Sequence, residues 1–431
     1  MVVITKKKLV LLLLLFFFIS NKIYSSVILD YETEIFIKKI NNLILSVNNL
    51  KNNIKFHIIY DENPNAFVNE NNEIYISSGL IEKSPSYVAL LGVLAHEIGH
   101  IEKFHIAKRK ESIENINSIN MLGSLSIIAG SIISNNPRVI EAMIANKVGI
   151  NNFYLNFSKN QEREADHYAV ETLNKLNLPT KSLLKLLNII EDDSLKKGND
   201  PEYHKFSTHP VYTKRYEIIN EKKEDSNSTI DMKLENEFSY IRAKFIGFSS
   251  KNNSNFQKYL NGKYIDYANS IFYSKNGDLM KSLKPLNNII KNNDSNIFLL
   301  ETKGDILLSY GYKKEAIKFY NKVLTQYPKN NYVQLRIFNN IDVIPISKRK
   351  KNKLFMDNIN LLFKFPKYNI LYQKYKFLSE SLNKNNWLDF FNTYQNKDNL
   401  NKKTYNDNLN KIMTKTSDNK LIKLINFHLN L

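Results

Sequence analysis

The stretch VALLGVLAHEIGHIE, residues 88–102, decides the fold, because it joins an apolar helical pattern to two histidines that lie four residues apart. A helix of 3.6 residues per turn places His96 and His100 on the same face, with Glu97 beside the first of them. The apolar residues around them recur at steps of three or four. The stretch therefore predicts a buried helix that carries all three polar side chains.

Two imidazoles and a carboxylate in this spacing form the HExxH pattern of zinc hydrolases. His96 and His100 are predicted to bind one Zn²⁺, and Glu97 to act as the general base on the attacking water. With 8 histidines in 431 residues, a chance match is expected in about one in a hundred such sequences. Purely structural histidines are disfavoured, because burying them without a metal carries a heavy desolvation cost.

A catalytic zinc ion needs a third protein ligand and one open position. The metzincin class is excluded, because that spacing requires Gly and His where this chain has Lys103 and Ile106. His105 is expected to lie off the ligand face, since five residues advance a helix by about 140° from His100. We expect His105 to be a packing or capping residue.

The second polar cluster, QEREADH at residues 161–167, opens another helical pattern. Glu162 and Asp166 are four residues apart and share a helix face, so one can bind the metal while the other orients a ligating histidine. Glu164 is expected to point elsewhere. A solvated acidic face is the alternative interpretation of this cluster.

The N-terminus carries three lysines, an apolar run at residues 9–19 and then small polar residues. This pattern predicts a signal peptide over residues 1–26, with an uncleaved membrane anchor as the alternative. The chain has no cysteine, which excludes disulfides, thiolate ligands and a lipoprotein anchor. Together these features predict an exported protein of the bacterial periplasm.

The net charge of +19 does not indicate a nucleic-acid-binding protein, because the lysines are dispersed and no nucleic-acid-binding motif accompanies them. Proximity to an anionic membrane surface explains the charge as well, so peripheral membrane contact stays open. The weakly polar segment at residues 121–134 is too short to span a bilayer and fits a core helix or a surface-seeking segment.

A small sheet is predicted before the HExxH helix. Residues 27–50 have a helical pattern, and short strands are expected at 54–60, 66–68 and 73–77. The segment Asn65-Ala66-Phe67 is the candidate edge strand for pairing with an extended substrate, and an ordinary structural hairpin is the alternative. These elements define a predicted α+β domain over residues 27–225.

Beyond a polar run at residues 221–228, the pattern is helical, so residues 226–431 are predicted to form an all-α domain. One segment resembles a tetratricopeptide helix pair of about 34 residues. Its packing positions precede the anchor Pro328 and are Leu300, Gly304, Leu307, Ala316, Tyr320 and Val323. One repeat cannot bury its own face, so a solenoid of neighbouring repeats that binds partner proteins is expected.

Several short motifs together resemble the M48 family of zinc metallopeptidases. They are HEIGH, EREAD, and Asn65-Ala66-Phe67 followed by Ser78-Gly79-Leu80. Ser207-Thr208-His209-Pro210 with Arg215 resembles the branch of β-barrel assembly-enhancing proteases that carry tetratricopeptide repeats. The protease resemblance covers roughly residues 30 to 220, and the combination is far more specific than HExxH alone.

This resemblance implies a mainly helical, gluzincin-type domain with one zinc ion per chain and Glu162 as the third ligand. Asp166 is then the carboxylate that orients a ligating histidine. His209 is implied as a regulatory plug of the open position, while His209 or Arg215 could instead donate to the developing oxyanion. A plain loop histidine before a proline turn is the further alternative for His209.

The resulting hypothesis is a zinc-dependent endopeptidase that acts on misfolded or stalled cell-envelope proteins, in the quality control of outer-membrane proteins. Its expected partners are unfolded or misassembled envelope proteins and, through the repeat domain, the outer-membrane assembly machinery. The alternative is a chaperone-like scaffold whose repeat domain binds envelope proteins and whose protease site is mostly silent.

Overall fold

The structure, a computed structural model, describes most of the chain in eight stretches, which are 27–51, 54–69, 71–108, 157–196, 213–221, 228–292, 295–341 and 347–430. The expected signal peptide, the segment 121–134 and His209 lie outside the described residues. Two compact units are present, Met1–Tyr264 and Ile265–Leu431. The domain boundaries expected at residues 26 and 225 stay predictions.

The first unit contains a three-stranded sheet, as the sequence predicts. It follows helix α2 (Tyr31–Val47), whose first turn is capped by the Asp30 side chain accepting from the Thr33 backbone N–H at 2.8 Å. The strand order is β1-β3-β2, with β1 parallel and β2 antiparallel to the central strand β3. The strands are β1 (Phe56–Ile59), β2 (Ala66–Val68) and β3 (Ile74–Ser77). This order places β2 at an edge of the sheet.

Helices α3 (Ser78–Lys83) and α4 (Tyr87–Glu102) follow the sheet. The dipeptide Ser84-Pro85 predicts that Ser84 caps the HExxH helix, with Pro85 at the first helical position, and this prediction is wrong by two residues. Ser84 ends α3, because its backbone N–H and its hydroxyl both donate to the Leu80 carbonyl. Ser86 caps α4 instead, with its hydroxyl accepting from the Ala89 N–H at 3.3 Å.

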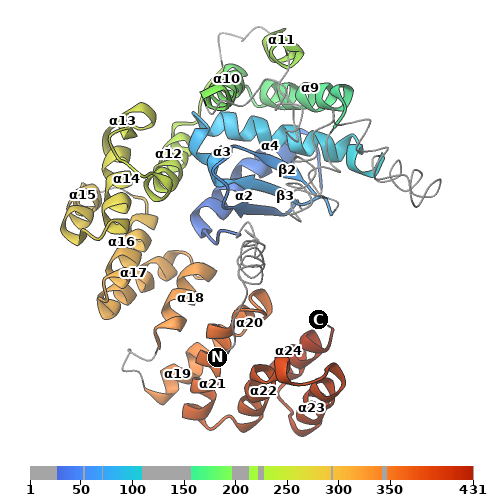
Figure 1. Ribbon diagram of the computed structural model, residues 1–431, viewed down its shortest axis with the longest axis vertical. Coiled ribbons are helices and arrows are strands. Elements are labelled where there is room, and N and C mark those ends of the chain that lie inside the picture. The colour runs from blue at the N-terminus through green and yellow to red at the C-terminus, as the bar shows by residue number, and fades with distance from the viewer. Residues whose placement is uncertain are drawn as a thin grey trace, which may run out of the picture. The chain divides into compact units, whose positions relative to one another are not determined.

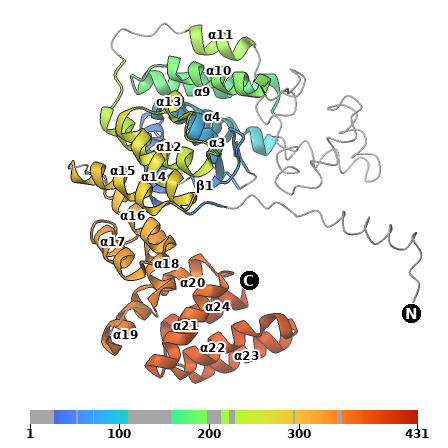
Figure 2. The same cartoon turned by 60° about the vertical axis from the view of Figure 1, so that its left-hand side comes forward.

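Helix α4 is the central element of the first unit. In both ribbon views it lies between the sheet on one side and helices α9 and α10 on the other (Figures 1 and 2). A helix covered on opposite sides must be apolar around most of its circumference, and nearly every residue of α4 from Tyr87 to His100 is buried. The other helices described in this unit are α9 (Lys159–Lys175), α10 (Lys181–Lys196), α11 (Thr213–Glu221), α12 (Met232–Ser249) and α13 (Phe256–Tyr259).

Gly99 sets the distance between α4 and α9. A Cβ atom at this position would lie 3.1 Å from Cβ of Tyr168 and 3.2 Å from Cα of Ala165. The Cα of Ala165 is backbone and cannot rotate away, so the close approach of the two helices requires glycine here. The same approach brings the polar face of α9 onto the two histidines of α4.

The second unit is all-α among its described residues. Its helices are α14 (Gly262–Lys275, which begins in the first unit), α15 (Leu279–Lys291), α16 (Phe298–Ser309), α17 (Lys313–Gln326), α18 (Asn331–Asn339), α19 (Lys348–Asp357), α20 (Asn360–Lys364), α21 (Asn369–Leu382), α22 (Asn385–Gln395), α23 (Lys402–Lys415) and α24 (Asn419–Leu429). The mainly helical fold with a small sheet is therefore confirmed.

The segment predicted to be a tetratricopeptide pair forms the packed helices α16 and α17. Gly304 and Tyr320 lie at their contact, where a Cβ on Gly304 would approach the Tyr320 ring to 2.6 Å. Contacts between α18 and α21 and between α20 and α24 join helices that are not consecutive, which a regular solenoid of nearest-neighbour repeats does not require. The tetratricopeptide-like solenoid stays a prediction.

Within the described ranges, no helix is both long enough and apolar enough to cross a membrane.

Gly99→Ala should destabilise the protein relative to Gly92→Ala by about 1–3 kcal/mol, because overpacking against backbone forces the helices apart. Gly92 is the matched control, since the nearest atoms to its added Cβ are the flexible ends of the Leu183 and Leu173 side chains, at 3.3 and 3.5 Å. Urea denaturation followed by circular dichroism measures both variants. Equal stabilities would contradict the role given to Gly99.

His428 should make the second unit sensitive to acid. Burial lowers the pKa of His428 to about 4, so the folded protein holds it neutral while the unfolded chain binds a proton below about pH 6.5. Stability is therefore lost as the pH falls from about 6.5 to 4, by up to about 3 kcal/mol. In urea denaturation, His428→Gln should lose less stability over this range than the wild type; identical losses would refute the assignment.

Candidate metal centre

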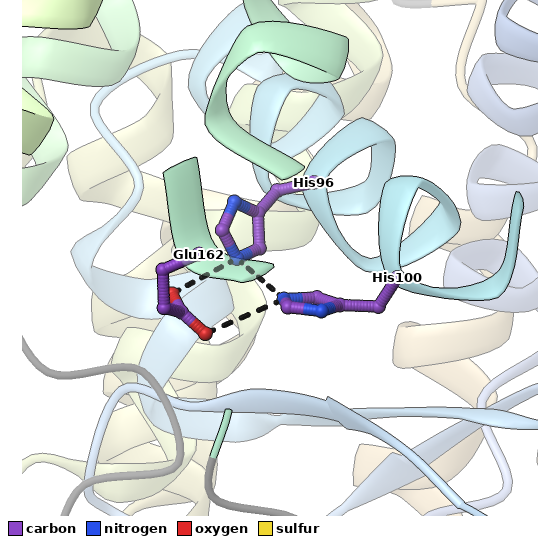
Figure 3. A group of neighbouring side chains, drawn as sticks. All are labelled: His96, His100 and Glu162. Atoms are coloured by element: carbon purple, nitrogen blue, oxygen red, sulfur yellow. Dashed lines mark hydrogen bonds and ion pairs between the residues drawn. The ribbon is translucent and has the colours of Figure 1, made fainter. Parts of the chain in front are cut away.

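Three buried side chains from two helices converge in the first unit. His96 and His100 come from α4 and Glu162 from the first turn of α9, and one ligand atom of each lies within 4.8 Å of the others (Figure 3). The two histidine Nε2 atoms are 3.1 Å apart, and each lies 3.4 Å from one carboxylate oxygen of Glu162. Among the described residues, this is the group of His, Asp and Glu that could hold a metal ion.

The spacing of these atoms fits a tetrahedral metal site. Zinc bonds of about 2.0–2.2 Å to nitrogen and oxygen place neighbouring tetrahedral ligand atoms about 3.3–3.5 Å apart. The two separations of 3.4 Å fall in this range, and the 3.1 Å between the two histidine nitrogens is slightly shorter. Two imidazoles and one carboxylate also leave a fourth position, as in catalytic rather than structural zinc sites.

The charge around the site favours a divalent cation. Glu97, Glu162 and Asp166 are at most 1% exposed, while the buried guanidinium of Arg215 is 6% exposed. With both histidines neutral, as metal binding requires, three carboxylates against one guanidinium leave two negative charges in excess in this described part of the site. Buried charge of one sign is costly unless compensated, and a divalent ion at the three ligands provides that compensation.

Asp166 connects His96 to Arg215. One carboxylate oxygen of Asp166 lies 2.9 Å from Nδ1 of His96, and Nε and Nη2 of Arg215 donate to the carboxylate at 2.9 and 2.8 Å. Burial alone raises the pKa of Asp166, but the positive charges of Arg215 and His96 outweigh it and hold the pKa below its ordinary value. An ionised Asp166 therefore directs Nε2 of His96 toward the metal position.

His105 is not among the three residues that could hold the metal, as expected, but the geometric reason given for that expectation is wrong. It assumed a continuous helix, but α4 ends at Glu102, and Phe104 adopts a left-handed conformation with φ of 57°. The chain turns back, so that Nδ1 of His105 lies 3.0 Å from Nδ1 of His100 and its Nε2 lies 3.0 Å from Glu164. Glu164, expected to point elsewhere, thus also belongs to this network.

Burial lowers the pKa of His105, against the opposing effect of Glu164. The Glu164 carboxylate has a lowered pKa, chiefly because it accepts the hydrogen bond from His105. Phe157 covers the other side of the pair, stacking on the His100 ring at a centroid distance of 3.7 Å. The ring of His100 is therefore fixed by contacts on both its edge and its face.

The other predicted site residues have different outcomes. Glu97 is buried on α4 directly after His96. Ala66 and Phe67 lie in the edge strand β2, and Asn65 immediately precedes it, with its carbonyl accepting from the Ser77 N–H at 2.9 Å. His209 lies outside the described residues, so its roles as plug or donor stay predictions.

Sequence reasoning missed the pair His105 and Glu164 and the stacking of Phe157. The position of His105 could not be predicted from helical geometry, because the helix ends in a turn at Phe104. A Gly or Asn, which usually marks such a left-handed turn in a sequence, is absent from that position. Phe157 has an apolar side chain in a stretch without a clear pattern. The ion pair between Arg215 and Asp166 joins residues 49 positions apart. Sequence spacing alone does not predict a contact over that distance along the chain.

Arg215→Met should destabilise the protein by about 3–5 kcal/mol, because it leaves the Asp166 and Glu162 carboxylates buried without their guanidinium. Arg163→Met is the matched control, since Arg163 is exposed on α9, and should change stability by less than about 0.5 kcal/mol. Urea denaturation of the metal-free chain measures both. A loss for Arg215→Met as small as for the control would contradict the structural role.

Comparison with known proteins agrees with this geometry. Residues 33–223 match the model of Peptidase family M48. The chain is 24% identical over 172 residues to the beta-barrel assembly-enhancing protease of Yersinia pestis, covering 40% of this chain and 35% of that protein. It is also 24% identical over 170 residues to the protein of that name from Escherichia coli strain K12, covering 39% and 34% of the two chains.

A related protein of Vibrio cholerae, whose name assigns it provisionally to the same group, is 27% identical over 172 residues, covering 39% of this chain and 34% of that protein. The chain thus aligns with about a third of the length of these curated relatives. The matched segment contains His96, His100 and Glu162, the three side chains that converge in the structure. Residues 33–223 therefore carry a peptidase family M48 domain, which supports a metallopeptidase.

Proposed function

We propose that this protein is a zinc-dependent endopeptidase that hydrolyses peptide bonds in misfolded or stalled cell-envelope proteins. The observation that carries the proposal is the triangle of His96, His100 and Glu162, whose separations of 3.1, 3.4 and 3.4 Å suit a tetrahedral zinc ion. The family match supports peptide hydrolysis as the reaction.

Each residue of the site has a distinct role in this proposal. Bound zinc supplies Lewis acidity, which polarises the scissile carbonyl and acidifies water. Glu97 takes the proton from the attacking water and later delivers it to the leaving amine. Asp166 holds His96 in the tautomer that leaves Nε2 available, and Arg215 holds Asp166 ionised.

The edge strand is the proposed binding place for the substrate backbone. Strand β2 pairs with β3 along one side in the register Ala66 to Ile76 and Val68 to Ile74. An extended peptide can add to an edge strand through backbone hydrogen bonds, and such binding favours unfolded proteins, whose backbone is accessible. Asn65, Ala66 and Phe67 are the proposed contacts, beside α4, which packs on β2.

The place of action in the cell envelope rests on the relatives. Three of them are named as enhancing the assembly of β-barrels, which suggests envelope quality control and contact with outer-membrane assembly machinery for this chain as well. The expected signal peptide fits a periplasmic location. The helical second unit is the proposed docking part, and His209 or Arg215 remain the proposed control or oxyanion groups near the zinc.

Glu97→Gln should retain zinc binding and lose at least about 100-fold in the rate of cleavage of an unfolded protein, because the general base is removed while the ligands stay. Cleavage of a permanently unfolded protein by the zinc-loaded chain measures the rate, and metal analysis measures the bound zinc. Chelation of the wild type should abolish cleavage, and zinc should restore it.

Glu102→Gln is the matched control, because Glu102 ends the same helix and lies outside the group of ligands. It should cleave at the wild-type rate. Wild-type turnover by Glu97→Gln would end the proteolysis hypothesis. A wild type that binds zinc and unfolded protein without cleaving it would favour the scaffold alternative.

A further inference from the structure

A turn with an unusual backbone places His105 beside the metal centre. Phe104 has φ of 57°, a left-handed conformation that is strained for a bulky side chain, and the residue is 67% exposed. This exposure means that Phe104 gains little from packing there. What the turn accomplishes is to bring His105, only 1% exposed, back against His100.

The hydrogen bonds from His105 run in one direction. The ionised Glu164 carboxylate can only accept, so Nε2 of His105 carries the proton of their 3.0 Å contact. In a neutral His105, Nδ1 then has a lone pair, and Nδ1–H of His100 donates to it across 3.0 Å. This arrangement leaves a lone pair on Nε2 of His100, the atom that faces His96 and Glu162.

The Nδ1 atom of His100 is therefore held through His105 by a carboxylate, whereas the Nδ1 atom of His96 is held directly by the carboxylate of Asp166. In both cases Nδ1 is engaged by a chain that ends in a carboxylate of α9. Glu162, Glu164 and Asp166 alternate along that helix, so one helix supplies a ligand and the end point of both chains. A buried histidine with both ring nitrogens engaged is not explained by packing, which an apolar side chain provides more cheaply.

We propose that His105 and Glu164 form a relay that positions His100 for metal binding, by fixing the tautomer and orientation of its ring. Both are positioning residues, since they act through His100. The proposal rests on the proposed function, because it concerns the same metal site. It adds two residues to that site, and it means that carboxylates of α9 orient both histidine ligands.

The test compares zinc dissociation constants of full-length variants, measured by competition with a chelator. His105→Phe keeps the ring shape and removes the acceptor, and should weaken zinc binding by about 10–100-fold. His105→Gln restores an acceptor oxygen and should recover part of this loss. Glu164→Gln, at a side chain that is 49% exposed, removes only the charge and should weaken binding by a smaller factor.

Two control variants match these changes on helix α9. His167→Gln and Glu171→Gln alter exposed residues that are separate from the relay, and both should bind zinc as the wild type does. Equal zinc affinities for the wild type, His105→Phe and Glu164→Gln would overturn the relay. If His105→Phe fails to fold, Glu164→Gln decides alone: weakened binding supports the relay, and unchanged binding overturns it.

A second readout is independent of zinc loading. Nitrogen-15 spectra of the imidazoles in the metal-free chain should show His100 protonated at Nδ1 in the wild type and a mixture of tautomers in His105→Phe. His100 protonated at Nε2 in the wild type would overturn the relay. A wild type that binds no zinc but shows the Nδ1 tautomer would refute the proposed function alone, so the two failures are distinguishable.

Discussion

The close packing of α4 against α9 at Gly99 is the contact on which the site depends. With Ala165 Cα only 3.2 Å from where a Cβ would lie, the two helix backbones approach as nearly as a glycine allows. Glu162 and Asp166 flank that contact on α9, while His96 and His100 flank it on α4. The approach of two backbones thus sets the 3.4 Å separations between carboxylate oxygens and imidazole nitrogens.

The polar groups of the site can be buried without a large loss of stability only because they are buried together. Buried carboxylates, imidazoles and a guanidinium would each be destabilising alone, but here each one has a partner of complementary character. Arg215 and His96 both contact Asp166, and His105 links His100 to Glu164. A divalent metal ion neutralises the excess negative charge that remains. Metal binding is therefore expected to stabilise the core.

The fold around the site serves to hold α4 in place. The sheet and α2 cover one side, and α9 and α10 cover the other (Figure 1). An edge strand then lies close to the helix that carries the ligands, because α4 packs on β2. The same packing that buries α4 therefore places β2, the strand proposed to bind an extended substrate, against the helix that carries the two histidines.

The sequence by itself determined the HExxH helix, the three short strands and the pairing of Glu162 with Asp166 on one face, because helix and strand periods are local properties of the chain. It misplaced the N-cap by two residues, since two serines compete near Pro85. Only the tertiary structure decided the partners of His105, Glu164 and Arg215. A turn at Phe104 without a turn-forming residue, and contacts across 49 and 59 positions, depend on how α4, α9 and α11 pack and not on any local pattern.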